Sequence, residues 1–66
     1  MELYETMYNF DDETAEIYTM NDGRTMVSIF DRDWECEGTK FNERRYYTQE
    51  SAESVVNGMY KHGWIF

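Results

Sequence analysis

The chain has 66 residues, which suffices for a single domain, residues 1–66, with one small core. Its 14 acidic residues against six Lys and Arg give a net charge of −8, which disfavours direct binding to nucleic acid because that needs a basic surface. Hydrophobic residues make up 41% of the sequence and follow regular patterns, which excludes a disordered chain, and no apolar run is long enough to span a membrane.

Cysteine and histidine occur once each, as Cys36 and His62. A disulfide within the chain is therefore excluded, and so is a structural metal site built from these residue types. What remains is dense packing of the two Trp, six Tyr and four Phe side chains, or oligomerisation. The free cysteine, and an acidic first segment where a signal peptide would be basic and then apolar, favour a cytoplasmic protein.

The first predicted element is a strand over residues 3–10. Aromatic and threonine side chains alternate along it and fall on one face, at Tyr4, Thr6, Tyr8 and Phe10. Three acids follow in a row, at Asp11, Asp12 and Glu13. We expect these acids to form a solvated turn, and they are candidates for contact with a basic partner.

A hairpin is predicted from residues 14–20 and 24–30, which flank the turn signal Asn21-Asp22-Gly23. A two-residue turn would place Ile17 opposite Ser28. A three-residue loop with Gly23 in the left-handed conformation would instead gather four aliphatic side chains on one face, namely Ala15, Ile17, Val27 and Ile29. We prefer the longer loop because the buried face determines the register.

The preferred register leaves an apolar set on the opposite face of the hairpin, namely Tyr18, Met20, Met26 and Phe30. Aromatic and methionine side chains are enriched in the centres of protein interfaces. This set is therefore a candidate surface for a partner protein or for a homodimer. The alternative is that the N-terminal strand or a loop covers it.

Acids recur at every second position of the next segment, at Asp31, Asp33, Glu35 and Glu37. If the segment is extended, the four carboxylates point the same way at a spacing of about 6.6–6.8 Å. That spacing is about two phosphate steps of one DNA strand. The row, together with Trp34, is a candidate surface for the basic groove of a nucleic-acid-binding protein. The alternative is a charged edge strand that prevents aggregation.

A cation site in this acidic segment is the remaining alternative, and the spacing argues against it. A calcium-binding EF-hand loop that started at Asp31 would need glycine where Cys36 stands and glutamate where Asn42 stands. The acids of residues 11–13 have no ligand spacing either. We expect no metal and no cofactor.

Catalysis is also not expected, and we assign no catalytic residue. The flanking carboxylates of Glu35 and Glu37 would raise the pKa of the Cys36 thiol and so reduce its thiolate form. His62 suits a helix end, where a cation is favoured for structural reasons. A chain this small also has little room for a deep pocket. We therefore expect a binding protein rather than an enzyme.

Residues 40–47 predict a fourth strand, on which Arg44 and Arg45 face opposite ways, so that one of them can pair with acids of a neighbouring strand. Thr48 is the predicted N-cap of a helix. One face of this helix is apolar and contains Ala52, Val55, Val56, Met59 and Tyr60.

The helix should end at Gly63, in a left-handed conformation that folds Trp64 back on Met59. Together these elements predict an α+β fold, an antiparallel sheet of three to four strands with one C-terminal helix packed on one face.

Charge is uneven along the chain: residues 1–23 hold seven acids and no Lys or Arg, whereas residues 38–66 have a net charge of +1. In acid content, compact α+β layout and acidic strand, the chain resembles the small acidic inhibitors that phages make against host or defence enzymes. These include uracil-DNA glycosylase inhibitors and several anti-CRISPR proteins. The resemblance implies a DNA-mimicking inhibitor that binds a protein with a basic surface. The alternative is a protein-interaction module or homodimer that uses the apolar face of Tyr18, Met26 and Phe30.

Overall fold

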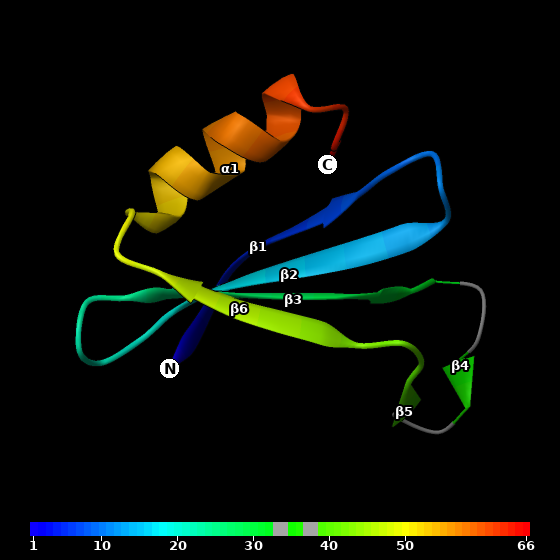
Figure 1. Cartoon of the computed structure of the whole chain (residues 1–66), viewed down its shortest axis with the longest axis horizontal. Helices are drawn as coiled ribbons and strands as arrows, with labels where there is room; N and C mark the ends of the chain where they lie inside the picture. Colours follow the sequence, from blue (N-terminus) through cyan, green and yellow to red (C-terminus); the bar gives the residue numbers. More distant parts are fainter. Residues whose placement is uncertain (33–34, 37–38) are drawn as a thin grey trace.

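The computed structural model describes residues 1–32, 35–36 and 39–66, with the backbone alone at residues 35, 36 and 39. Four strands form an antiparallel sheet in the order β1-β2-β3-β6, and their bounds are Glu2–Tyr8, Glu13–Thr19, Thr25–Asp31 and Arg44–Thr48. The helix α1 (Ala52–Lys61) lies across one face of the sheet (Figure 1). Two short strands, β4 (Glu35–Cys36) and β5 (Thr39–Lys40), pair with each other in a second sheet. The predicted α+β layout is confirmed.

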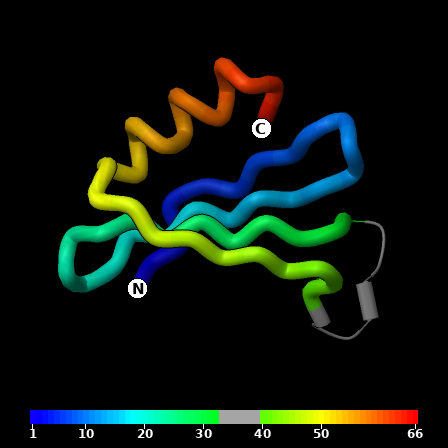
Figure 2. Tube along the Cα trace, in the orientation of Figure 1, coloured from blue at the N-terminus to red at the C-terminus, as the bar shows by residue number. Residues whose placement is uncertain are grey.

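The β2–β3 hairpin has the register that the aliphatic face predicts. Ile17 lies opposite Val27, and the Met20 N–H donates to the Arg24 carbonyl oxygen at 2.9 Å, which leaves a three-residue loop between them. Gly23 closes this loop at a φ of 88°, in the left-handed region that favours glycine. The predicted three-residue loop is therefore confirmed, and the loop lies at the opposite end of the sheet from the C-terminal end of β3 (Figure 2).

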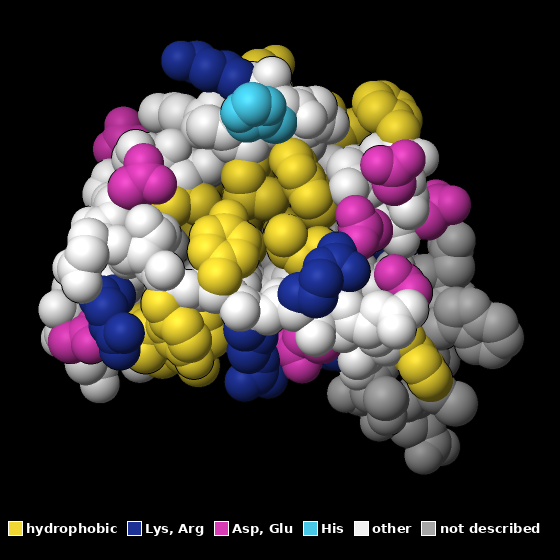
Figure 3. Space-filling view, viewed as in Figure 1, with side chains coloured by type: hydrophobic (Ala, Val, Ile, Leu, Met, Phe, Trp, Pro, Cys, Tyr) yellow, Lys and Arg dark blue, Asp and Glu magenta, His cyan; other side chains and the backbone are white. Residues whose placement is uncertain are grey.

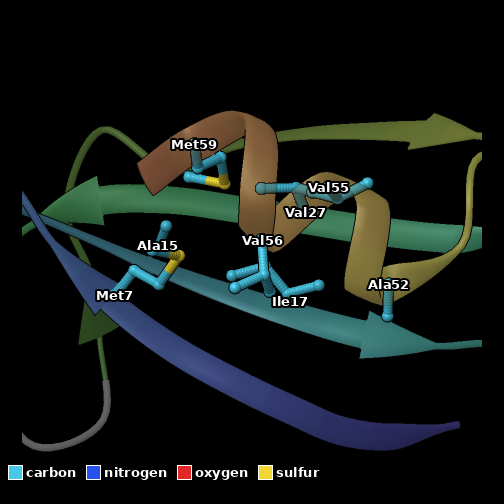
Figure 4. Packing of buried hydrophobic residues seen from close by; sticks show 8 residues of the cluster. All are labelled: Met7, Ala15, Ile17, Val27, Ala52, Val55, Val56 and Met59. Carbon is cyan, nitrogen blue, oxygen red and sulfur yellow. The ribbon is translucent and has the colours of Figure 1, made fainter. Parts of the chain in front are cut away.

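The core lies between α1 and the facing side of the sheet (Figure 4). Its buried members are four sheet residues and four helix residues, Met7, Ala15, Ile17, Val27, Ala52, Val55, Val56 and Met59. Ile29 and Trp64 pack against its margin. The predicted apolar face of α1 is confirmed except at Tyr60, which is 60% exposed because it falls just outside the buried stripe. The Tyr60 ring instead stacks on Phe66, with ring centroids 6.2 Å apart.

The two ends of α1 show one correction and one confirmed prediction. Ser51, not Thr48, is the N-cap: its backbone is extended and its Oγ accepts from the Ser54 N–H at 3.2 Å. The C-terminus has the predicted Schellman geometry. Gly63 has a φ of 96°, and the Trp64 N–H donates to the Met59 carbonyl oxygen at 3.0 Å.

The first and last strands of the main sheet differ from the sequence prediction. The alternation along β1 is interrupted by a bulge between Leu3 and Glu5, so Tyr4 does not share a regular face with Thr6. Phe10 lies beyond β1 in the following turn, where it is 85% exposed.

The predicted fourth strand, residues 40–47, is divided. The chain turns at Asn42, whose φ is 54°, so Lys40 belongs to β5 and the sheet strand β6 begins only at Arg44. Within the described ranges, no helix is long and apolar enough to cross a membrane.

Candidate binding surfaces

The segment with alternating acids does not continue the strand that precedes it. β3 ends at Asp31, the chain bends at Arg32, and the next strand, β4, belongs to the second sheet. Asp31 and Glu35 therefore lie in different sheets, and the single continuous strand on which a straight row of carboxylates depended is not formed. The Asp31 carboxylate accepts a hydrogen bond from Asn42 Nδ2 at 2.6 Å.

Three residues of the predicted acidic surface, Asp33, Trp34 and Glu37, lie outside the described residues. For Glu35 the structure gives the backbone pairing with Lys40 and no side-chain position. Binding through these four residues therefore stays a prediction.

The acidic turn at residues 11–13 is divided between solvent and the sheet. Asp11 is exposed, whereas Asp12 pairs with Arg32 at 2.9 Å. Glu13 is the first residue of β2 and pairs with Arg44 of β6. Hydrogen bonds from Arg44 and, secondarily, from Asn9 hold the pKa of the Glu13 carboxyl below its usual range. Glu13 thus contributes to the sheet. Asp11 and Asp12 are both exposed to a partner, and Asp11 alone of the two has no ion pair with a described residue.

Five of the six Lys and Arg side chains form ion pairs inside the molecule, as Arg24–Asp22, Arg32–Asp12, Lys40–Glu16, Arg44–Glu13 and Arg45–Glu43. Arg44 and Arg45 thereby use opposite faces of β6, as their strand positions predict. Among the described side chains, six carboxylates form no ion pair, namely Glu2, Glu5, Asp11, Asp31, Glu50 and Glu53. The negative charge that remains is therefore available to a partner.

The apolar set expected on the second face of the hairpin is buried or half-buried in this structure. Met26 is buried, and Tyr18, Met20 and Phe30 are half-buried. Lys40 lies over the Phe30 ring, 5.0 Å from its centroid. The structure thus supports, for Phe30, the alternative in which another segment covers this face.

Polar contacts also involve this apolar set, on the sheet face that α1 does not cover. Glu16 accepts a hydrogen bond from the Tyr18 hydroxyl at 3.0 Å and pairs with Lys40. Burial and the bond to Glu16 raise the pKa of Tyr18, and the bond to Glu16 raises the pKa of Lys40.

Two residues outside the predicted apolar set extend the apolar face at its other end. Leu3 lies opposite Tyr18, and Tyr47 lies opposite Met26, so one row crosses all four strands. Leu3 is 51% and Tyr47 is 50% exposed. No local pattern marks this row, because it arises only when β1 and β6 take their places at the two edges.

A groove that the sequence did not predict lies between α1 and the edge strand β6. It encloses about 260 Å³, and its apolar walls are formed by Ile29, Tyr46, Val55, Met59 and Trp64. Glu50 and His62 also line it. In Figure 3 hydrophobic side chains gather in a hollow below the single histidine. Burial and the nearby Glu50 carboxylate raise the pKa of Tyr46.

His62 has a structural explanation at the end of α1. It is exposed and forms the C-cap: its backbone N–H donates to the Met59 carbonyl oxygen at 3.0 Å, and the Gly63 N–H donates to the Tyr60 carbonyl oxygen at 3.3 Å. No three His, Cys, Asp or Glu residues in the described ranges are grouped so that they could hold a metal ion.

In comparisons with known proteins, no family model, no curated protein and no solved structure matches the chain.

Proposed function

We propose that the chain is a non-enzymatic acidic protein that occupies the basic, nucleic-acid-binding surface of a partner protein and so inhibits it. The observation that carries this proposal is that positive and negative side chains differ in how many form ion pairs within the molecule. Almost all the cations are neutralised internally, while six carboxylates of the described chain form no ion pair. The basic surface of a partner would relieve the repulsion among these carboxylates.

Salt limits the distance over which these charges act. Physiological salt screens a charge over about 8 Å, whereas the molecule measures 31 × 25 × 15 Å. A basic groove on a partner is therefore attracted mainly by the carboxylates on the face that it approaches. Such attraction accelerates association and makes binding strongly dependent on salt.

The test uses proteins captured on the immobilised chain from a lysate and then purified. For each captured protein, affinity for the chain is measured at low and high salt, and competition with duplex DNA is measured by fluorescence anisotropy. The proposal expects binding that weakens steeply with salt and excludes DNA. A captured protein that binds the chain and DNA at the same time contradicts the proposal, and so does an affinity that salt does not change.

A matched pair of variants locates the binding charge. Asp33→Lys with Glu35→Lys reverses two acids of the alternating segment, and Glu2→Lys with Glu5→Lys reverses two acids of β1 with the same change in net charge. If the alternating segment is the contact surface, the first variant loses affinity and the second loses far less. Equal losses would show that the overall field, rather than this segment, binds the partner.

A further inference from the structure

The two edges of the main sheet differ in how they are closed. β1 has a bulge between Leu3 and Glu5, and its C-terminal end pairs with the tail through two N–H···O bonds of 2.7 Å between Tyr8 and Ile65. β6 pairs regularly with β3 over five consecutive residues, and in the described part of the chain no segment pairs along its outer side. β6 is thus a regular strand with an open edge, which can accept another strand.

Charge favours a second copy of the chain as the strand that β6 accepts. Two molecules of net charge −8 repel each other, but the charge is concentrated in residues 1–23, whereas residues 38–66 have a net charge of +1. The part of the molecule that contains β6 and α1 is therefore where two copies can approach without strong repulsion. A strongly basic strand is a poorer fit, because β6 itself begins with Arg44 and Arg45.

When β6 of one copy pairs antiparallel with β6 of a second copy, charges of opposite sign meet at both ends of the paired strands. When Tyr46 lies on the two-fold axis, all five residues of each β6 are paired, and Arg44 lies opposite Thr48 of the second copy. Beyond Thr48 comes Glu50, which is exposed and forms no ion pair with a described residue. Symmetry then brings Arg44 of each copy, which already pairs with Glu13 of its own chain, near Glu50 of the other copy. Each guanidinium would then lie between two carboxylates, one from each copy.

The groove beside β6 adds apolar contact to this pairing. Tyr46 lies opposite Val27, whose side chain is in the core, so Tyr46 is on the helix-covered face of the sheet and lines the groove. In the symmetric pair, Tyr46 of each copy is directly opposite its counterpart. Each ring then reaches the groove of the other copy, where Trp64 is half-buried and the wall is apolar.

We propose that two copies of this chain associate by antiparallel pairing of β6 about a two-fold axis at Tyr46, which joins two four-stranded sheets into one of eight strands. The paired segments are short, and interfaces below about 1,200 Å² are typical of weak complexes. We therefore expect a dimer that forms at concentrations on the order of 10–100 µM.

Sedimentation velocity of the purified chain tests the dimer, over about two decades of concentration so that mass action is visible. The decisive variants are Arg44→Glu and Glu50→Lys. Each places like charges at both ends of its own homodimer, so each should self-associate at least about tenfold more weakly. In an equal mixture, the glutamate introduced in one variant faces the lysine introduced in the other, and the unchanged Arg44 and Glu50 face each other at the opposite end. Association of the mixture should therefore recover to near that of the wild type.

The mixture separates this register from other modes of association. Wild-type chain that stays monomeric over the whole range overturns the proposal, and so does a mixture that fails to recover while circular dichroism shows both variants folded. A third variant, Tyr46→Lys, places two like charges on the axis and should abolish the dimer, whereas Tyr60→Lys on the outer side of α1 should not. These measurements need no partner protein, so their failure leaves the proposed inhibition untouched.

Discussion

Lys40 of β5 forms an ion pair with Glu16 of β2, 24 positions away, on the sheet face that α1 does not cover. The same ammonium group lies over the Phe30 ring, 5.0 Å from its centroid. One side chain thus fastens the segment after β3 to the sheet by both a charge pair and a cation–π contact.

Lys40→Met should therefore lower the free energy of unfolding by about 0.5–1 kcal/mol, because the ion pair is partly exposed and contributes modestly. Urea denaturation followed by Trp fluorescence measures the change. Glu16→Gln, alone and together with Lys40→Met, is the control. Losses that simply add in the double variant would show that the contact with Glu16 is not responsible.

The Glu13 carboxyl should titrate below its reference pKa of 4.5, because Arg44 and then Asn9 donate hydrogen bonds to its charged form. A lowered folded-state pKa contributes stability above pH 4.5 that is lost as the pH falls through the folded-state value. Glu13→Gln should remove this part of the acid sensitivity. Carbon-detected NMR titration of the side-chain carboxyl is the direct check, and a Glu13 pKa at or above the reference would contradict the assignment.

Substitutions at Ile17 should lower the stability of the protein in proportion to the side-chain volume removed, because Ile17 is completely buried between the sheet and α1. Ile17→Val should cost about 0.5–1.5 kcal/mol and Ile17→Ala about 2–5 kcal/mol, since each removes buried methyl groups and leaves a cavity. Leu3→Ala, at a half-exposed position, should cost much less. Thermal unfolding by circular dichroism ranks the three, and a Leu3 variant as unstable as Ile17→Ala would mean that the core is placed wrongly.

Two glycines near the end of the chain should respond in opposite directions to alanine. Gly58 lies inside α1 and an added Cβ there meets nothing within 4 Å, so Gly58→Ala should stabilise the protein by up to about 1 kcal/mol. Gly63 has a φ of 96°, so Gly63→Ala should destabilise it by about 1–2 kcal/mol. Chemical denaturation of the two variants measures the sign of each change in the free energy of unfolding. A stabilising Gly63→Ala would rule out the left-handed helix end.

The parts of the fold that could be predicted from sequence are those that depend on neighbouring residues. The register of the β2–β3 hairpin follows from Gly23 and from the aliphatic face that includes Ile17. The end of α1 follows from Gly63 in the same local way. In both places one residue with special backbone freedom fixes a turn, and the apolar pattern beside it fixes which side is buried.

The features that the sequence did not reveal arise from contacts between distant segments. The bulge at Leu3 appears only when β1 is paired with β2, and the turn at Asn42 divides a segment whose composition reads as one strand. The groove beside β6 likewise needs Ile29 of β3, Tyr46 of β6 and Trp64 of the C-terminal tail to meet. The alternating acids of residues 31–37 are clear in the sequence. The strand expected to align them is not formed in the main sheet, because β3 ends at Asp31.

The bridge between Tyr8 and Ile65 has a consequence for how the chain folds. It joins the end of the first strand to a residue near the other end of the sequence, so this contact closes a loop that includes nearly the whole chain. Contacts of such large sequence separation slow folding, because their loop entropy is lost before they contribute stability. During synthesis β1 can already pair with β2, but the bridge from Tyr8 must wait until residue 65 has left the ribosome. Until then the outer side of β1 stays unpaired at Tyr8.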